Sequence, residues 1–203
     1  MMLVENYING YSIRFSKNVR DQFTDDEFYE FCRMNNTLKF ERDKDGNILI
    51  MALTGGKTGK RNGEITADLI IWNRKLKAGN VFDSSTGFRL PNTSVRSPDA
   101  AWISNEKWNA LSETEKEKFP PLCPEFIIEL MSATDEITHA FVKMNEYMEN
   151  GCELAWLIYP AEKKTFIYRK GENKEIIEGF DKKLSGESVL NGFEFDLKEI
   201  GLE

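Results

Sequence analysis

The hydrophobic positions of this chain alternate between the spacing typical of helices and the spacing typical of strands. In the middle of the chain, apolar residues recur every three or four positions, which predicts a helix over about 62–78 that ends at Gly79. The face of this helix that would pack on the core consists of Ile65, Leu69, Trp72 and Leu76. A capping box of Thr24 and Glu27 predicts an earlier helix that continues to about Met34.

Two later segments also carry helix signals. Residues 132–135 supply capping side chains for a helix that runs to about Asn150, and Asp135 is interpreted as its N-cap. The polar segment 104–118 is interpreted as a solvated surface helix.

Short apolar runs between the helices predict strands. Asp45-Gly46 is a hairpin signal, so the runs on either side of it are expected to pair. The predicted strands span residues 38–42, 47–53, 81–82, 88–90, 95–103, 124–131, 153–159, 165–169 and 175–178. These elements predict an α/β (α+β) fold in one domain, with a mixed β-sheet covered by three helices. Residues 24–170 form its expected core, and 171–203 supply C-terminal strands and an irregular tail.

Two acidic residues lie within predicted strands that are otherwise apolar. Asp99 lies in the segment 95–103 and Glu129 in the segment 124–131. A buried carboxylate loses its hydration, so it needs a compensating partner. If the two strands are neighbours, alternation lets both carboxylates reach one divalent cation. With Lys143 in the following helix, this set is a candidate metal-dependent hydrolytic site.

Each of these residues has an ordinary structural explanation when it is taken alone. Asp99 follows a proline and is typical of a turn cap, and Lys143 is typical of a helix surface. Glu64 is typical of a first-turn partner of the helix dipole. Glu129 is harder to explain, since Phe-Ile-Ile and Leu-Met flank it. The site hypothesis therefore depends on the set and not on its members.

Composition limits the metal and the partners. The single histidine, His139, excludes a histidine-rich zinc centre, so oxygen ligands and Mg²⁺ or Mn²⁺ are favoured. The net charge of −7 argues against non-specific nucleic-acid binding. A local basic stretch is nevertheless available, formed by Lys57, Lys60, Arg61, Arg74, Lys75 and Lys77. The glycine-rich segment 54–60 is interpreted as a mobile basic loop, because it lacks the first glycine of an ATP-binding loop.

Other features of the sequence favour a cytoplasmic protein. The chain has 203 residues, of which 40% are hydrophobic and 30% charged, and no apolar run reaches the roughly 18–20 residues of a membrane span. Its first residues have neither the basic nor the hydrophobic region of an export signal. The three cysteines lie far apart without a Cys-x-x-Cys spacing, which is typical of reduced thiols.

Several short motifs follow one another along the chain in a specific order. They are residues 96–100 (Arg-Ser-Pro-Asp-Ala), 124–130 (Pro-Glu-Phe-Ile-Ile-Glu-Leu) with Ser132 and Asp135, and 143–147 (Lys-Met-Asn-Glu-Tyr). Residues 54–59, 82–88 and 155–160 extend the likeness. From about residue 24 to the end, the chain resembles the Uma-type family of putative restriction endonucleases, within the PD-(D/E)XK nuclease superfamily.

The resemblance implies a restriction-endonuclease-like core, in which a mixed four-stranded sheet has helices on both sides. It implies that Asp99 and Glu129 bind the metal, together with the backbone carbonyl of Leu130. Glu64 would be the acid contributed by the first core helix. The superfamily's lysine usually lies two residues after the second acid, where this chain has Met131, and the resemblance implies that Lys143 replaces it.

We therefore predict an endonuclease that uses Mg²⁺ (or Mn²⁺) to hydrolyse DNA phosphodiester bonds. Lys143 would polarise the phosphate or the attacking water, and a homodimer would allow two sites to cut both strands. The alternative is a catalytically inactive nuclease-fold domain that binds a partner or DNA, which the acidic charge and Met131 favour. A metal-free acid hydrolase has little support, because its two carboxylates would need to titrate separately.

Overall fold

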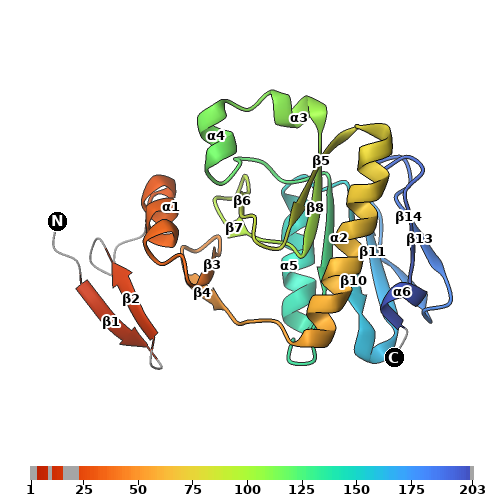
Figure 1. The fold of residues 1–203 in the computed structure, drawn as a ribbon, viewed down its shortest axis with the longest axis horizontal. Coiled ribbons are helices and arrows are strands. Elements are labelled where there is room, and N and C mark those ends of the chain that lie inside the picture. The colour runs from red at the N-terminus through yellow and green to blue at the C-terminus, as the bar shows by residue number, and fades with distance from the viewer. Residues whose placement is uncertain (1–3, 9–10, 16–22, 202–203) are drawn as a thin grey trace.

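The computed structural model describes residues 4–8, 11–15 and 23–201. Its centre is a six-stranded sheet with the strand order β12-β11-β10-β9-β8-β5. Figure 1 shows the arrangement of the elements and labels β5, β8, β10 and β11 of this sheet. These strands are β5 (Gly79–Asp83), β8 (Ala100–Ser104), β9 (Phe126–Leu130), β10 (Leu154–Tyr159), β11 (Lys164–Arg169) and β12 (Glu175–Glu178). In this sheet β9 and β10 pair in parallel and the other neighbours are antiparallel. The prediction of a mixed sheet is confirmed.

Two helices cover opposite faces of this main sheet. Helix α2 (Gly56–Leu76) buries Ile65, Leu69 and Trp72 in the core on one face. Helix α5 (Ile137–Glu149) packs on the other face and connects the parallel strands β9 and β10. Such a crossover is what parallel neighbours require. Among the described residues, no helix combines the length and apolarity needed to span a membrane.

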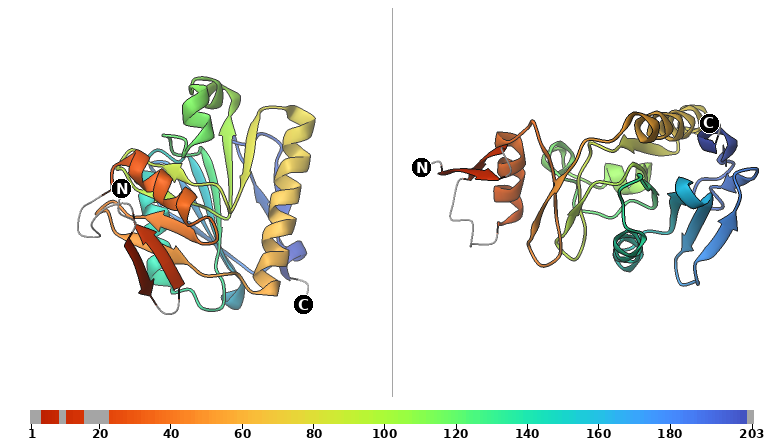
Figure 2. Two further views of the ribbon diagram at one scale, coloured as in Figure 1. Left: turned by 60° about the vertical axis from the view of Figure 1, so that its left-hand side comes forward. Right: turned by 90° about the horizontal axis from the view of Figure 1, so that it is seen from below.

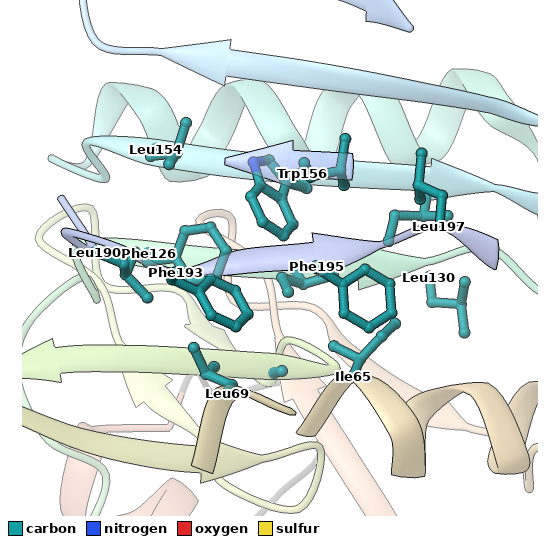
Figure 3. Close-up of a cluster of buried hydrophobic side chains, with 14 of the residues drawn as sticks. Ile65, Leu69, Phe126, Leu130, Leu154, Trp156, Leu190, Phe193, Phe195 and Leu197 are labelled. Carbon is teal, nitrogen blue, oxygen red and sulfur yellow. The ribbon is translucent and has the colours of Figure 1, made fainter. Parts of the chain in front are cut away.

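The C-terminal residues complete the core on the α2 face. They form a hairpin of β13 (Lys183–Ser185) and β14 (Glu194–Asp196), followed by helix α6 (Lys198–Gly201). Their buried side chains are Leu184, Leu190, Phe193, Phe195, Leu197 and Ile200. Figure 3 labels Leu190, Phe193, Phe195 and Leu197 among the core residues. The ring of Phe193 stacks on Trp156 of β10, with centroids 5.9 Å apart and planes at 11°. The prediction of an irregular tail is wrong, because apolar residues at strand spacing bury themselves against the sheet.

Helix α1 packs on a second, smaller sheet. This sheet has the order β4-β3-β7-β6 and lies to one side of the main sheet (Figure 2). Its strands are β3 (Lys39–Arg42), β4 (Ile48–Met51), β6 (Phe88–Arg89) and β7 (Val95–Arg96). Helix α1 (Asp25–Met34) buries Phe28 and Phe31 with Phe40 in a separate core. The expectation that three helices cover one sheet is therefore wrong for α1. Strands β1 (Val4–Ile8) and β2 (Tyr11–Phe15) pair antiparallel with each other.

Local signals predicted some element ends correctly and misplaced others. The capping box of Thr24 and Glu27 and the hairpin around 45–46 are both present. Helix α2 begins at Gly56 rather than near 62, so most of the expected mobile loop is helical. Its glycines lower helix propensity and hide the start of the helical pattern. Lys77, and not a glycine at 79, provides the left-handed C-cap, with φ of 53°.

The predicted helices after β8 and β9 also need correction. Segment 104–118 contains two short helices, α3 (Asn105–Asn109) and α4 (Glu113–Glu117). Helix α5 begins at Ile137, so Asp135 is not its N-cap. Asp135 instead accepts a hydrogen bond of 2.6 Å from the backbone N–H of Ser132, within a turn. A 3-10 turn, η1 (Pro160–Glu162), joins β10 to β11.

The packing of the C-terminal hairpin predicts a large destabilisation by Phe193→Ala. Phe193 is 2% exposed, and removing a buried aromatic ring costs about 3–5 kcal/mol. Urea unfolding monitored by circular dichroism measures this loss. The matched control is Glu194→Ala, at the exposed neighbouring position, which changes the free energy of unfolding by less than about 0.5 kcal/mol. Equal stability of the two variants would contradict the assignment of this hairpin to the core.

Candidate active site

Asp99 and Glu129 meet at one end of the main sheet. Strands β8 and β9 are antiparallel neighbours, with Ala100 paired to Ile128, so the preceding and following residues lie side by side. Asp99 lies in a bend just before β8, because the predicted strand 95–103 is divided into β7 and β8. Pro98 in this bend has no N–H to donate to a ladder. The expectation that Asp99 lies inside a strand is therefore wrong, although the two strands are neighbours.

The carboxylate of Asp99 is held by two donors. Its Oδ2 accepts a hydrogen bond of 2.8 Å from the backbone N–H of Leu130. Its Oδ1 accepts one of 3.0 Å from the side-chain amide of Asn62 on α2. In a regular strand the N–H and C=O of one residue point to the same side, so the carbonyl of Leu130 is expected on the side of Asp99.

Glu129 is bound by two side chains of helix α5. Its Oε1 lies 2.8 Å from Nζ of Lys143 and accepts a hydrogen bond of 2.8 Å from the hydroxyl of Tyr147. Lys143 and Tyr147 are four residues apart, so they lie on the same side of the helix. A lysine from the helix after β9 thus lies beside the second acid, where the sequence has Met131 at the usual lysine position.

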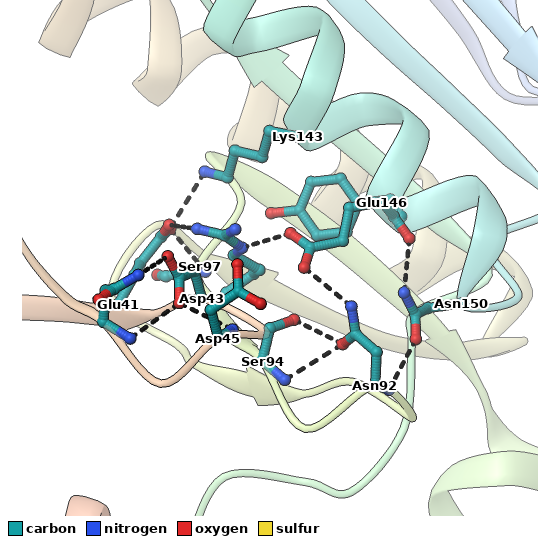
Figure 4. A network of polar contacts seen from close by, with 12 residues as sticks. Glu41, Asp43, Asp45, Asn92, Ser94, Ser97, Lys143, Glu146 and Asn150 are labelled. Carbon is teal, nitrogen blue, oxygen red and sulfur yellow. Dashed lines mark hydrogen bonds and ion pairs between the residues drawn. The ribbon is translucent and has the colours of Figure 1, made fainter. Parts of the chain in front are cut away.

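Glu41 is a third acid at this site and was not among the residues predicted from the sequence. It lies on β3 with a side chain 2% exposed, and its Oε1 is 3.0 Å from Nζ of Lys143. The same oxygen accepts a hydrogen bond of 2.9 Å from the backbone N–H of Ser97 (Figure 4). An acid between Phe40 and Arg42 in a predicted strand was the available signal.

Arg96 and Glu146 extend the network away from the sheet end. The guanidinium of Arg96 lies 3.2 Å from Oε2 of Glu41 and donates from Nε to Glu146 over 2.6 Å. Asn92 donates to the other oxygen of Glu146 over 2.9 Å. Both charged side chains are nearly buried. The network therefore joins β3, β7 and α5 (Figure 4).

The charged groups of this site do not balance. We call the following six residues the acid–lysine cluster: Asp99, Glu129, Glu41, Glu146, Lys143 and Arg96. With four carboxylates and two cations, the ionised cluster has a surplus of two negative charges. One divalent cation has the charge that would compensate this surplus.

The imbalance changes the pKa values of the buried groups. Burial, reinforced by the charges of Asp99 and Glu41, raises the pKa of Glu129 from 4.5 to about 7 despite the attraction of Lys143. For Lys143, burial would lower the pKa, but the carboxylates of Glu129 and Glu41 outweigh it and raise the pKa. For Glu41, burial is outweighed by Lys143, the Ser97 N–H and Arg96, so its pKa is lowered. Lys143 is therefore charged at neutral pH.

The oxygen donors of this site fit a magnesium or manganese ion that keeps waters among its ligands. They do not form a metal site that protein side chains alone would complete. Within the described part of the chain, no three side chains of His, Cys, Asp or Glu converge as a ready-made metal site. Mg²⁺ is commonly held by one or two carboxylates, with waters and substrate phosphate oxygens as its other ligands. Asp99, Glu129 and the Leu130 carbonyl offer oxygen atoms of this kind.

Helix α2 contributes Asn62, and not the predicted Glu64, to the contacts of Asp99. Glu64 lies in the third turn of α2 and is exposed, so the structure does not bring it to the other acids. Its role as a catalytic acid stays a prediction. Of the basic stretch, Lys57 and Lys60 are exposed on the first turns of the same helix. Arg61 instead donates to the backbone carbonyl of Ile200 over 2.9 Å.

A mixed sheet with helices on both faces, and with two acids and a lysine at one end, is the arrangement expected of the restriction-endonuclease-like fold. The chain belongs to the Uma2 family, described as "Putative restriction endonuclease", whose profile matches residues 25–198. The crystal structure of a putative nuclease belonging to DUF820, from Anabaena variabilis, is similar to this chain with a TM-score of 0.70. The identity is 18%, over 88% of this chain and 97% of that one. A search of curated proteins finds no match.

The raised pKa of Glu129 predicts a pH-dependent stability of the metal-free protein. Because the folded protein binds this proton more tightly than the unfolded chain, its free energy of unfolding falls as the pH rises from 4.5 to about 7. The contribution of Glu129 is about 3 kcal/mol. Urea unfolding between pH 4 and 8 measures this contribution: over that range the free energy of unfolding of the wild type should fall by about 3 kcal/mol more than that of Glu129→Gln. Parallel profiles would show that Glu129 has an ordinary pKa.

Proposed function

We propose that this protein is a metal-dependent endonuclease that hydrolyses phosphodiester bonds of DNA. Mg²⁺ or Mn²⁺ would be held by Asp99, Glu129 and the carbonyl of Leu130. The observation that carries the proposal is the surplus of two negative charges in the acid–lysine cluster, which includes the charged Lys143, at one end of the sheet. Membership of a family described as "Putative restriction endonuclease" supports the same activity.

Lys143 would act in the proposed reaction as a fixed positive charge. In the hydrolysis, a water oxygen forms a bond to phosphorus and the bond from phosphorus to one sugar oxygen breaks. A bound divalent cation would supply an acidified water and stabilise charge on the phosphate. The raised pKa of Lys143 argues against a role as general base, since its ammonium holds its proton at neutral pH. Its positive charge would stabilise the additional charge of the pentavalent phosphate.

Glu41 and Tyr147 would be positioning residues in this proposal. Glu41 contacts Lys143 at 3.0 Å and is itself held by Ser97 and Arg96, so the ammonium is oriented before substrate arrives. Tyr147 donates to Glu129 and fixes one of its oxygens. Such preorganised groups need little rearrangement during the reaction.

The proposed substrate is DNA, although the chain has a net charge of −7. Lys57 and Lys60 are exposed on the helix whose Asn62 contacts Asp99, so phosphates near the site would meet local positive charge. We place the activity in the cytoplasm, where the three free cysteines would remain reduced.

The second candidate function is a catalytically inactive nuclease-fold domain that binds DNA or a protein. The observation that favours it is the pairing of Glu129 with Lys143 and Tyr147, which satisfies this carboxylate without a metal. A metal must then compete with an ion pair that already exists. The two functions differ in whether the protein binds Mn²⁺ and cleaves DNA.

Asp99→Asn is expected to weaken metal binding at least tenfold and to abolish cleavage. The wild type should nick supercoiled plasmid DNA with Mg²⁺ or Mn²⁺ and lose this activity with EDTA. Without the charge of Asp99, the surplus of the cluster falls from two negative charges to one. We therefore expect at least a tenfold weaker Mn²⁺ affinity by isothermal titration. The matched control, Asp135→Asn, changes an exposed aspartate outside the cluster and should keep both properties. A wild type without Mn²⁺ binding or nicking would favour the inactive domain.

Lys143→Met should separate catalysis from metal binding. The substitution removes the positive charge that competes with a metal at Glu129, so Mn²⁺ affinity should be equal or higher. The cleavage rate should fall about 10²–10³-fold, as for the loss of one preorganised stabilising donor. Lys174→Met is the control. Nζ of Lys174 lies 3.6 Å from the ring centroid of Phe141, a residue of helix α5, and Lys174 is outside the cluster. Unchanged cleavage by Lys143→Met would remove this residue from the proposed mechanism.

A further inference from the structure

Strand β4 is an open edge of the smaller sheet. It pairs with β3 on one side, and no strand pairs with its other side in the part of the chain that the structure describes. The edge and the segment after it expose three large apolar side chains: Leu49 at 39%, Ile50 at 44% and Leu53 at 101%. Unpaired backbone groups with apolar side chains are a template for pairing with another strand.

This edge lacks the charges that usually protect a strand edge. Residues 47–56 contain no charged side chain, in a chain of which 30% is charged. Strand β12, at the edge of the main sheet, exposes Ile176 at 50% but has Glu175 and Glu178 at its ends. Such charges oppose edge-to-edge pairing, because like charges would meet in the pair. Strand β4 has nothing of this kind.

We propose that β4 is the interface at which two copies of this chain associate. The β4 strands would pair antiparallel about a two-fold axis normal to the sheet, which joins two four-stranded sheets into one of eight strands. A molecule with a net charge of −7 repels a second copy of itself over most of its surface. A two-fold axis brings the same strand of both copies together. An uncharged strand then meets no like charge in its partner. The lack of charge on β4 disfavours a charged partner, and its fit to its own sequence about a two-fold axis favours a second copy.

The register of β4 connects this interface to the acid–lysine cluster. Leu49 is paired with Glu41 on β3, so the two side chains lie on the same face of the small sheet. A two-fold axis normal to the sheet keeps this face on the same side in both copies. The two β3 strands would be three strand spacings apart, about 14 Å, which is close to the roughly 12 Å width of a major groove. Two clusters would thus face one duplex, a consequence that rests on the proposed function.

The mass of the protein in solution, without metal or DNA, tests the interface. Sedimentation equilibrium should give the mass of two chains for the wild type and of one chain for Ile50→Lys. The matched control is Ile176→Lys, which places the same charge on an edge strand of the main sheet and should leave two chains. Circular dichroism should show equal folding of all three proteins. A wild type with the mass of one chain would overturn the proposal, as would an Ile50→Lys variant with the mass of two.

Cross-linking provides a second readout that does not depend on a destabilising charge. Cysteine at position 49 or 50 lies beside the proposed two-fold axis, so at least one of Leu49→Cys and Ile50→Cys should form a covalent dimer under mild oxidation. Ile176→Cys should remain a single chain under the same conditions. No covalent dimer from either β4 variant, or an equal amount from Ile176→Cys, would contradict pairing through β4.

Plasmid cleavage distinguishes a failure of the interface from a failure of the proposed function. If both are correct, the wild type linearises plasmid DNA, while Ile50→Lys nicks one strand and linearises at least tenfold less. A wild type with the mass of two chains but no cleavage keeps the interface and overturns the proposed function. A wild type that cleaves DNA but has the mass of one chain keeps the proposed function and overturns the interface.

Discussion

The ammonium group of Lys143 is the point on which the rest of this site depends. It lies 2.8 Å from Glu129 on the main sheet and 3.0 Å from Glu41 on the smaller sheet. One cation on helix α5 therefore joins strands of two different sheets. Asp99 lies near this ammonium group because its carboxylate accepts a hydrogen bond from the backbone N–H of Leu130, the residue after Glu129. Residues that are distant in sequence thus converge at the ends of β8 and β9.

Burying these charges is an expensive way to stabilise a fold. The desolvation of a buried ion pair often exceeds its Coulombic gain, and apolar side chains of similar volume would serve stability as well or better. The acid–lysine cluster also leaves the pKa of Glu129 raised to about 7, so one acid is strained in its ionised form. Strongly shifted pKa values next to specific charges are typical of functional sites. The proposed function, in which the cluster binds a cation near a phosphate, would account for this cost.

The sequence predicted features that depend on neighbouring residues. The capping box at Thr24, the hairpin around 45–46 and the alternation along β8 and β9 are all local, and the structure contains each of them. Glu41 could not be predicted as a partner of Lys143, because that contact depends on how β3 lies against α5. The glycines of α2 concealed where this helix begins, and this error placed Glu64 in a first turn. The position of Asn62 beside Asp99 follows from packing between α2 and β8, which no local pattern records.

The most direct test of a cation in the acid–lysine cluster is a crystal structure of the protein with Mn²⁺, with anomalous diffraction to identify the metal. The proposed function predicts one strong anomalous peak, at about 2 Å from carboxylate oxygens of both Asp99 and Glu129. The carbonyl of Leu130 should lie within the same coordination sphere, and Lys143 should keep its contact with Glu41. Crystals that bind Mn²⁺ elsewhere, or not at all, with the pair of Glu129 and Lys143 intact, would contradict it.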